Sequence, residues 1–414
     1  MIVPSIDLMG GHAVQLVGGK ELSIDAGDPR PLADKFGRVG EVAVIDLDAA
    51  LGQGSNAEVI EELLRRAPCR VGGGIRDVET ARRWLNAGAR KVILGTAARP
   101  EILAELPRDR VIAALDAVHG EVVVDGWRTK TGATVEDRMR ELAPHCGGFL
   151  VTFVEREGRR TGMDLEAVKR LVEVAGDCDL TVAGGVAQAA EIGAIDRAGA
   201  DVQVGMALYQ GDLDLADALA ATLKSDRPDG LWPTVVTDTQ GIALGLVYSN
   251  EESLRQAIET GRGVYWSRSR DSLWRKGESS GATQELVDIA LDCDRDALRF
   301  RVRQAGAGFC HLDTRGCWGP DAGISELART LARRVADAPQ GSYTRKLLDD
   351  PTLLAAKLAE EAGELAEATE LDDVAWETAD VLYFALVALA RAGGSLDDVE
   401  RHLNLRALKV TRRN

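Results

Sequence analysis

The 414-residue chain has little cysteine, an excess of negative over positive charge, and no long apolar run. Six cysteines are too few for a disulfide scaffold. The formal net charge of −16 argues against general binding to nucleic acid or to anionic membranes. The longest apolar runs fall well short of the roughly 18 residues that a membrane span needs. The start, "MIVPSIDLMGG", lacks the basic region of a signal peptide, so the sequence predicts a cytoplasmic protein.

The few cysteines fall into two groups. Cys293, Cys310 and Cys317 lie close together among carboxylates, and this arrangement suggests a metal site. The other cysteines stand alone and are expected to be small buried side chains: Cys69, Cys146 and Cys178. A chain of this length is too long for one hydrophobic core and suggests two to three domains.

The first half of the chain alternates short apolar runs with stretches of helical character. This alternation is typical of parallel β/α units. The strand-like runs within residues 1–225 are "VAVIDLD", "CRVGGG", "KVILG", "RVIAALD", "FLVTFV", "LTVAGG" and "DVQVG".

An internal repeat crosses this region. "IDLMGGHAV" (6–14) resembles "LDAVHGEVV" (115–123), which pairs Asp7 with Asp116 and Gly11 with Gly120. At about the same offset, "VGGGI" recurs as "VAGGV" and "LGTA" recurs as "VGMA". Two halves of about 110 residues with four strands each predict an α/β fold, the eight-stranded (β/α)8 TIM barrel. A doubly wound open sheet is the alternative.

Two aspartates and a set of glycines stand where such a barrel has its active site, at the carboxyl ends of the strands. Asp7 ends the first predicted strand and Asp116 ends the fifth, so their carboxylates can act as general base and general acid across one substrate. The glycine loops can bring backbone N–H groups against phosphate, or can simply make tight turns. Their paired recurrence predicts a substrate with a phosphate at each end. The loop residues are Gly72, Gly73, Gly74, Gly95, Thr96, Gly184, Gly185 and Gly205.

Five motifs within about residues 1–215 occur in the same order as in a known enzyme family. Together they resemble the isomerase of histidine biosynthesis that rearranges the bisphosphate ProFAR (phosphoribosylformimino-AICAR-phosphate) to PRFAR. The resemblance implies a barrel domain over residues 1–222, in which Asp116 opens the ribose ring as acid and Asp7 moves a proton as base. The motifs are "SIDLMGGHAV", "VGGGIRD", "ILGTAA", "DGW" and "GMALYQG".

Three positions depart from the pattern of this family. Gln15 stands where the family usually has Arg, Glu157 where it has Asp, and Met206 where it has Lys. The extra methylene of Glu157 can misplace its carboxylate by about 1 Å and lower the rate. A degenerate barrel that serves only as a scaffold is therefore an alternative, which the intact pair of Asp7 and Asp116 opposes.

A change of composition predicts a linker at residues 223–233. This segment, "LKSDRPDGLWP", holds two prolines, a glycine and several charges. Beyond it, a small α+β domain is expected over residues 227–320. Its strand-like runs are "TVVTD", "IALGLVY", "GVYWSR" and the alternating "LRFRVR", and its helical run is "NEESLRQAIET".

The clustered cysteines of this domain have the spacing C-x16-C-x6-C, which does not fit a closed site of four cysteines. Three thiolates leave a fourth position for water, the arrangement of a catalytic zinc ion, although a structural zinc ion is the alternative. Carboxylates suit a hard ion such as Mg²⁺ that also binds substrate phosphate. The carboxylates that interleave with the first cysteine are Asp292, Asp294 and Asp296.

A basic segment, "WSRSRDSLWRKGESSG" (266–281), stands out against the acidic background. It can hold ribose phosphates, with Trp266 and Trp274 packing on a base, or it can be a solvated charged loop. Its basic side chains are Arg268, Arg270, Arg275 and Lys276.

Five motifs of the middle domain resemble phosphoribosyl-AMP cyclohydrolase. The resemblance implies that zinc-bound water opens the adenine six-membered ring and that the thiolates are shared across a dimer. Ala282 stands where the family often has His, and Leu312 and Asp313 stand where it has "TG", which leaves His311 as the imidazole candidate. The motifs are "SNEES", "WSRSR", "LWRKGESSG", "LDCDRDAL" and "CHLDTRGCW".

The C-terminal part, residues 322–414, has apolar residues at helical spacing and is expected to be all-α, with "SLDD" (395–398) as a capping box. Residues three apart share a helix face, so two pairs of carboxylates can converge between two helices to hold Mg²⁺. They are otherwise an ordinary charged surface. Asp380 lies in "TADVLYFALVALA", a helix expected to be mostly buried, where a carboxylate needs a partner. The four carboxylates are Glu361, Glu364, Glu377 and Asp380.

This helical part resembles phosphoribosyl-ATP pyrophosphohydrolase, an all-α relative of the MazG-type pyrophosphatases. The resemblance implies that Mg²⁺ on the four carboxylates, with Glu360 as a possible extra ligand, activates water against the α–β phosphate link. The motifs are "GSYTRKLL", "KLAEEAGELAEA" and "ETADVLYFALVAL".

The three resemblances imply consecutive reactions and predict a trifunctional enzyme of histidine biosynthesis. Its cofactors would be Zn²⁺ and Mg²⁺, and its substrates small phosphoribosyl nucleotides that include an adenine ring. A homodimer through the cyclohydrolase and helical domains is expected, with no nucleic acid and no membrane as partner. The alternative is a bifunctional enzyme with a scaffold-only barrel.

Overall fold

The computed structural model describes residues 1–414 except 20, 125–126, 128, 158, 160–161 and 412–414. Asp125 and Gly126 of the "DGW" motif therefore lie outside the described residues. The chain divides into two compact units. The first comprises Met1–Asp238, Gly245–Gly306 and Ala407–Asn414, and the second comprises Thr239–Leu244 and Ala307–Arg406.

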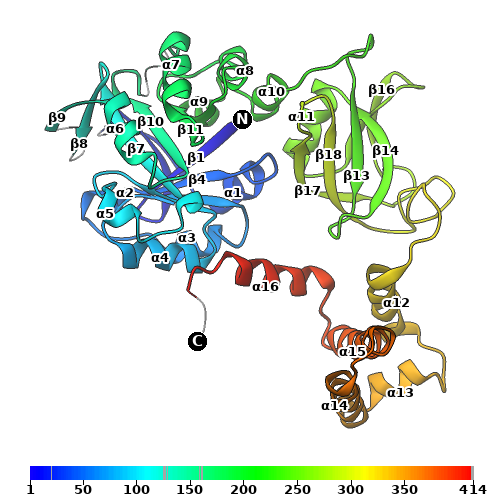
Figure 1. The fold of residues 1–414 in the computed structure, drawn as a ribbon. Helices are drawn as coiled ribbons and strands as arrows, with labels where there is room; N and C mark the ends of the chain where they lie inside the picture. The colour runs from blue at the N-terminus through cyan, green and yellow to red at the C-terminus, as the bar shows by residue number, and fades with distance from the viewer. Residues whose placement is uncertain (20, 125–126, 128, 158, 160–161, 412–414) are drawn as a thin grey trace. The chain divides into compact units, whose positions relative to one another are not determined.

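Eight parallel strands at the start of the chain close into a barrel, because the first strand pairs with the second on one side and with the eighth on the other (Figure 1). The closed ring confirms the (β/α)8 fold and excludes an open sheet. In chain order the strands are β1 (Ile2–Met9), β4 (Val42–Asp46), β5 (Cys69–Gly72), β6 (Lys91–Leu94), β7 (Val111–Val118), β10 (Gly148–Phe153), β11 (Asp179–Ala183) and β12 (Asp201–Val204).

Helices follow the barrel strands and cover their outer side (Figure 1). Side chains cap several of them, as when the Asp77 carboxylate accepts from the backbone N–H of Thr80 at the start of α4. The isolated cysteines at 69, 146 and 178 are buried, as expected. The helices are α1 (Arg30–Phe36), α2 (Leu47–Leu51), α3 (Ala57–Leu63), α4 (Val78–Ala87), α5 (Pro100–Leu103), α6 (Val135–Leu142), α7 (Leu165–Ala175), α8 (Ala189–Arg197), α9 (Met206–Gln210) and α10 (Leu215–Ala220), with short 3₁₀ turns at Arg108–Arg110 and Val154–Arg156.

Two antiparallel hairpins repeat the symmetry of the two halves. β2 (His12–Val17) and β3 (Glu21–Gly27) follow β1, whereas β8 (Glu121–Val124) and β9 (Thr129–Thr134) follow β7. Both entry turns are left-handed, at Gly10 and Gly11 in one half and at His119 and Gly120 in the other. The repeated motif seen in the sequence is therefore a strand followed by a tight turn.

The middle part forms a six-stranded sheet in the order β16-β15-β14-β13-β18-β17, with one helix, which confirms the α+β prediction. Residues 223–231 have no strand or helix and join the barrel to β13, as the linker prediction required. Along β18 the side chains of Leu298, Phe300 and Val302 are buried and the intervening arginines are not. The elements are β13 (Trp232–Thr237), β14 (Ala243–Ser249), α11 (Glu251–Thr260), β15 (Val264–Ser267), β16 (Ser272–Arg275), β17 (Gln284–Leu291) and β18 (Leu298–Gln304).

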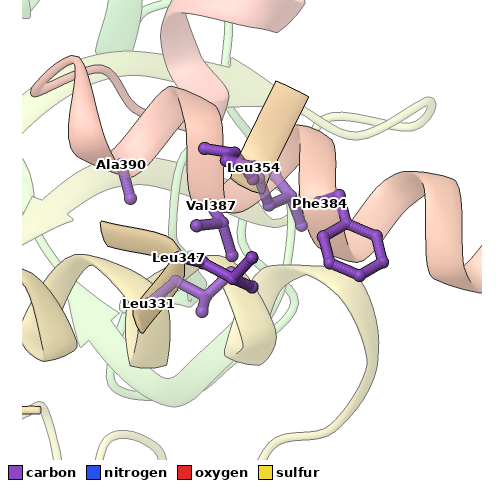
Figure 2. Close-up of a cluster of buried hydrophobic side chains, with 7 residues drawn as sticks. Leu331, Leu347, Leu354, Phe384, Val387 and Ala390 are labelled. Atoms are coloured by element: carbon purple, nitrogen blue, oxygen red, sulfur yellow. The ribbon is translucent and has the colours of Figure 1, made fainter. Parts of the chain in front are cut away.

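The C-terminal part is helical, as predicted. Ser395 and Asp398 exchange hydrogen bonds at the start of α16, where the capping box was expected. Figure 2 shows side chains of the helical core pointing toward one another, among them Leu331, Leu347, Leu354, Phe384, Val387 and Ala390. The helices are α12 (Gly323–Asp337), α13 (Tyr343–Asp349), α14 (Pro351–Glu367), α15 (Leu371–Arg391) and α16 (Leu396–Leu408).

The prediction that the helix around Asp380 is mostly buried was wrong for its first half. Phe384 and Val387 of this segment are in the core, but Ala379 is exposed and Leu382 is 37% exposed. Apolar spacing alone does not reveal how much of a long helix the rest of one chain covers. No single described helix meets the length and apolarity that a bilayer span requires, although α15 and α16, bent by 109°, meet those two criteria together.

Candidate active sites

A cavity of about 1240 Å³ opens at the carboxyl ends of the barrel strands. Each residue predicted for this site lines the cavity except Gly72, which ends β5 in the barrel wall. Two strands on opposite sides of the ring supply the aspartates, and the turns after β5, β6, β11 and β12 supply the glycines. The lining residues predicted from sequence are Asp7, Asp116, Gly73, Gly74, Gly95, Thr96, Gly184, Gly185 and Gly205, together with the departures Gln15, Glu157 and Met206.

Asp7 is buried, and the loss of water around its carboxylate raises its pKa to about 6. The Ser5 hydroxyl donates to Asp7 Oδ1 at 2.7 Å and lowers the pKa in part. The amide of Gln15 donates to Asp7 Oδ2 at 3.5 Å. The departure at position 15 therefore places a neutral donor beside the predicted base.

Asp116 and Glu157 share the same desolvated environment. Burial raises the pKa of Asp116, against hydrogen bonds from Trp127 and Thr152 that lower it. Burial and then the negative charges of Asp7 and Asp116 raise the pKa of Glu157 to about 7. A carboxyl group with a pKa of about 7, such as Glu157, can exchange protons near neutral pH.

The glycines differ in why they carry no side chain. Gly73 and Gly184 have positive φ angles, and a Cβ atom would lie 2.2 Å from Asp46 O in one case and 2.6 Å from Phe153 O in the other. These two residues therefore have a steric reason to be glycine. Around Gly95, a Cβ atom would meet no described atom within 4 Å, so the chain itself gives no steric reason for glycine at this position.

Three arginines that the sequence analysis did not single out also line the cavity: Arg76, Arg99 and Arg138. Arg76 lies within the "VGGGIRD" motif and donates to Ala50 O at 3.1 Å. Arg138 donates to Ala98 O at 2.6 Å. Their positive charge suits an anionic ligand. Nothing in the local sequence distinguishes these three from the other arginines, because only the folded barrel brings them to the cavity.

The three clustered cysteines divide between the two units. Cys293 is exposed and belongs to the first unit, whereas Cys310 and Cys317 belong to the second. Within the second unit, hydrogen bonds from the backbone at Leu312, from Thr314 and from Cys317 lower the pKa of the Cys310 thiol. A lowered thiol pKa favours the thiolate, the form that binds zinc.

The aspartates beside Cys293 form a compact cluster. The ligand atoms of Asp292, Asp294 and Asp296 lie within 4.8 Å of one another. Burial works to raise the pKa of Asp292, but hydrogen bonds from Ala297 and Asp296 outweigh it and lower the pKa. The charge of Asp294 raises the pKa of Asp296. A cation would relieve this repulsion, and oxygen ligands of this kind suit Mg²⁺.

The predicted basic segment folds as the hairpin of β15 and β16. The Arg268 guanidinium lies 3.9 Å from the centre of the Tyr248 ring, and Arg270 donates to Ser267 Oγ at 3.1 Å. Arg268, Arg270 and Arg275 are exposed, and Lys276 is half-buried. Trp274 packs against Tyr265 of its own sheet, with ring centres 5.7 Å apart.

The predicted carboxylates of the helical domain converge between α14 and α15. The ligand atoms of Glu361, Glu377 and Asp380 lie within 4.8 Å of one another, and a hydrogen bond links Glu364 to Glu377. Burial and the neighbouring charges raise the pKa values of Glu361 and Glu377. Oε2 of Glu377 is buried and has no hydrogen-bond partner among the described residues. This orphaned oxygen within a set of carboxylates fits a bound Mg²⁺ ion.

A TIM barrel with carboxylates at its mouth, joined to an α+β domain and a helical domain, defines a multidomain chain of the β/α-barrel class. The family model described as histidine biosynthesis protein matches residues 1–214, and the chain belongs to that family. Two further family models match, phosphoribosyl-AMP cyclohydrolase over residues 245–319 and phosphoribosyl-ATP pyrophosphohydrolase over residues 324–407.

Curated relatives agree with these matches. A histidine biosynthesis trifunctional protein of Komagataella pastoris is 53% identical over 199 residues, which are 48% of this chain and 24% of that protein. A histidine biosynthesis bifunctional protein of Schizosaccharomyces pombe is 53% identical over 201 residues, 49% of this chain and 48% of that protein. An imidazole-4-carboxamide isomerase of Methanocorpusculum labreanum is 36% identical over 237 residues, 54% of this chain and 99% of that protein.

Proposed function

We propose that the chain is a trifunctional enzyme of histidine biosynthesis. It would hydrolyse phosphoribosyl-ATP to phosphoribosyl-AMP and pyrophosphate, open the adenine ring to give ProFAR, and isomerise ProFAR to PRFAR. The single observation that carries the proposal is the order of three family matches whose reactions are consecutive. The chain spans about a quarter of the length of the Komagataella pastoris relative and about half of that of the Schizosaccharomyces pombe relative. The proposed activity therefore rests on the residues of this chain.

In the barrel, Asp116 is the proposed acid and Asp7 the proposed base. Burial raises the pKa of Asp116, which helps it hold the proton that it donates to the ribose ring oxygen. Asp7, with a pKa of about 6, is mostly ionised at neutral pH and can accept a proton from the opened sugar. Their convergence on one large cavity favours an active isomerase over the scaffold-only alternative.

In the middle domain, Cys293, Cys310 and Cys317 are the proposed zinc ligands. Bound zinc would supply an activated water molecule for opening of the adenine ring. The lowered pKa of Cys310 supports thiolate ligation. The basic hairpin would hold the ribose phosphate through Arg268, Arg270 and Lys276, and the aspartate cluster would hold Mg²⁺.

In the helical domain, Glu361, Glu364, Glu377 and Asp380 are the proposed Mg²⁺ ligands. The bound ion would supply charge for attack of water on the α–β phosphate link. Glu360 is a weaker candidate because its carboxylate already pairs with Lys357 at 2.8 Å. The buried, unpartnered oxygen of Glu377 supports the assignment most directly.

We further propose a cytoplasmic homodimer that involves the cyclohydrolase and helical domains. Large apolar side chains are exposed there, such as Trp318 of the first and Leu371 and Trp376 of the second. Burial of such side chains is the usual driving force for association. Two subunits would also allow one thiolate set to be shared.

One incubation tests the three activities together. Phosphoribosyl-ATP and Mg²⁺ are added to the purified chain, and the products are separated with time. We expect conversion to PRFAR through phosphoribosyl-AMP and ProFAR. An end point at ProFAR would leave the barrel as a scaffold and support the bifunctional alternative.

Mixing of inactive chains tests the shared zinc site. The zinc content of Cys310→Ser should fall together with cyclohydrolase activity. If the ligands are shared between subunits, Cys293→Ala and Cys310→Ala chains should regain part of the activity when mixed, because one composite site keeps all three thiolates. No recovery in confirmed heterodimers would place the three ligands within one chain. Unfolding of the domain on zinc removal would instead indicate a structural zinc ion.

A further inference from the structure

The acidic loop that follows β17 touches the barrel within the first unit. The two domains meet at several points there, for example where Ile289 N donates to Arg38 O at 2.7 Å and Arg38 Nη1 donates to Ile258 O at 2.7 Å. Arg295 lies at the tip of the loop, between Asp294 and Asp296, and its Nη1 donates to Asp196 Oδ1 at 2.6 Å. Asp196 belongs to α8 of the barrel.

The contact is more buried than an ordinary surface ion pair. The Asp196 side chain is only 5% exposed and the Arg295 side chain 27%. The same Asp196 oxygen accepts from the Met1 amino group at 2.6 Å. A buried charge without its partner is costly. Loss of the Arg295 or the Asp196 side chain should therefore destabilise the segment that carries the other.

Arg295 is also held in an unusual backbone conformation. Its φ angle is +65°, in the left-handed region that large side chains rarely adopt. Its carbonyl oxygen accepts from Lys224 N, in the segment that leads out of the barrel, at 2.8 Å. Such a conformation persists where the surroundings fix it, and here both the side chain and the carbonyl are fixed by residues outside the loop.

This conformation decides where the neighbouring carboxylates point. Asp292 accepts from Asp296 N at 3.0 Å and from Ala297 N at 3.2 Å, which closes the loop around residue 295. The ligand atoms of the three aspartates then lie within 4.8 Å of one another despite their like charges. Release of Arg295 would let Asp294 and Asp296 turn apart.

We propose that Arg295 and Asp196 are positioning residues for Mg²⁺ binding by the aspartate cluster, so that the barrel preorganises the metal loop of the neighbouring domain. This inference rests on the proposed cyclohydrolase function. It predicts that a change on a barrel helix, outside the isomerase cavity, alters the metal requirement of a different reaction.

The test measures the cyclohydrolase rate on supplied phosphoribosyl-AMP as a function of Mg²⁺ concentration in the full-length, zinc-loaded chain. Arg295→Gln should raise the Mg²⁺ concentration for half-maximal rate on the order of tenfold, the usual size of an effect behind the metal ligands. The rate at saturating Mg²⁺ should stay near that of the wild type. Arg295→Lys, which keeps the charge, should lie between the two and keeps the test decisive if the Gln variant does not fold.

The barrel side is tested in the same way. Asp196→Asn should raise the half-maximal Mg²⁺ concentration as Arg295→Gln does, with the isomerase rate unchanged. The double variant should be no worse than the more affected single variant, because both remove one interaction. Arg299→Gln is the matched control, since Arg299 is an exposed arginine of β18 in the same domain and its loss changes the net charge equally.

The outcomes separate this inference from the function on which it rests. A wild-type chain without Mg²⁺-dependent cyclohydrolase activity would overturn both. An active, Mg²⁺-dependent wild type whose Arg295→Gln and Asp196→Asn variants stay within about twofold of its half-maximal Mg²⁺ concentration would overturn the positioning role alone.

Discussion

The barrel and the helical domain each gather several carboxylates, but they hold them differently. In the barrel, Asp7 and Asp116 come from separate strands and face a large, desolvated cavity that raises their pKa values. In the helical domain, Glu361, Glu377 and Asp380 come from two neighbouring helices and approach within 4.8 Å of one another.

The difference indicates that the surroundings of a carboxyl group decide which purpose it suits. Carboxyl groups that face a cavity, and whose pKa values are raised by the loss of water, are suited to carry protons. Carboxylates crowded together, with an oxygen that lacks a hydrogen-bond partner, are suited to hold a divalent cation. Among the described residues, the groups of three possible ligands within 4.8 Å do not include the barrel carboxylates.

The largest effect is expected at the barrel base. Asp7→Asn keeps the shape of the side chain but cannot accept a proton, so isomerisation should fall about 10³-fold. The rate of ProFAR conversion is measured with and without Mg²⁺, and cyclohydrolase activity serves as the control. Equal loss of both activities would mean that Asp7 supports the fold rather than proton transfer.

A charge-removing change in the helical domain should behave in the opposite way. Glu377→Gln should reduce pyrophosphate release about 10²-fold at fixed Mg²⁺, with partial recovery at high Mg²⁺, because one ligand oxygen is replaced by an amide. Turnover of supplied phosphoribosyl-AMP is the control and should not change. If pyrophosphate release by Glu377→Gln does not respond to Mg²⁺, the helical carboxylates do not differ from the barrel carboxylates in the proposed way.

Substitution by alanine distinguishes a glycine that faces open space, Gly95, from one that is sterically confined, Gly73. Gly95→Ala meets open space, so the fold should be kept while KM for ProFAR rises about tenfold. Gly73→Ala would place its methyl group against Asp46 O, so its unfolding midpoint should fall. An unchanged KM for Gly95→Ala would show that the substrate does not approach this turn.

The smallest effect concerns the pH dependence of the isomerase. Ser5 donates to the ionised form of Asp7, so Ser5→Ala should raise the pKa of Asp7 by about half a unit. Because the base must be deprotonated, the rate should fall about threefold below pH 6 and change little at pH 8. A pH profile of kcat/KM measures this shift, and a loss of rate that is equal at all pH values would contradict it.

The sequence predicted the barrel well because its two halves repeat, so Asp7 and the glycines reinforced their counterparts. It could not show that Gly73 and Gly184 are sterically required, because the atoms that exclude a side chain come from Asp46 and Phe153 on neighbouring strands. The arginines of the cavity were missed for the same reason. They become neighbours only when the ring of strands closes.

Prediction was weaker where position depends on partners distant in sequence. The helical spacing of α15 correctly placed Glu377 and Asp380 on one face, because i and i+3 share a face, and both lie close to Glu361 of α14. The same spacing overestimated the burial of the helix around Asp380, where Leu382 is 37% exposed in the described chain. The link between Arg295 and Asp196 had no local signal, since 98 residues separate the two partners in the chain.

The cysteines differ in burial and in thiol pKa, so their thiols differ in reactivity. Burial raises the pKa of the thiols of Cys69 and Cys146 to about 12, which leaves almost no thiolate in the barrel for an oxidant or an alkylating reagent. Cys293 and Cys317 are exposed, and the pKa of Cys310 is lowered. Oxidation would therefore strike the proposed cyclohydrolase step before the proposed isomerase step, and phosphoribosyl-AMP is the intermediate expected to accumulate in an oxidised cell extract.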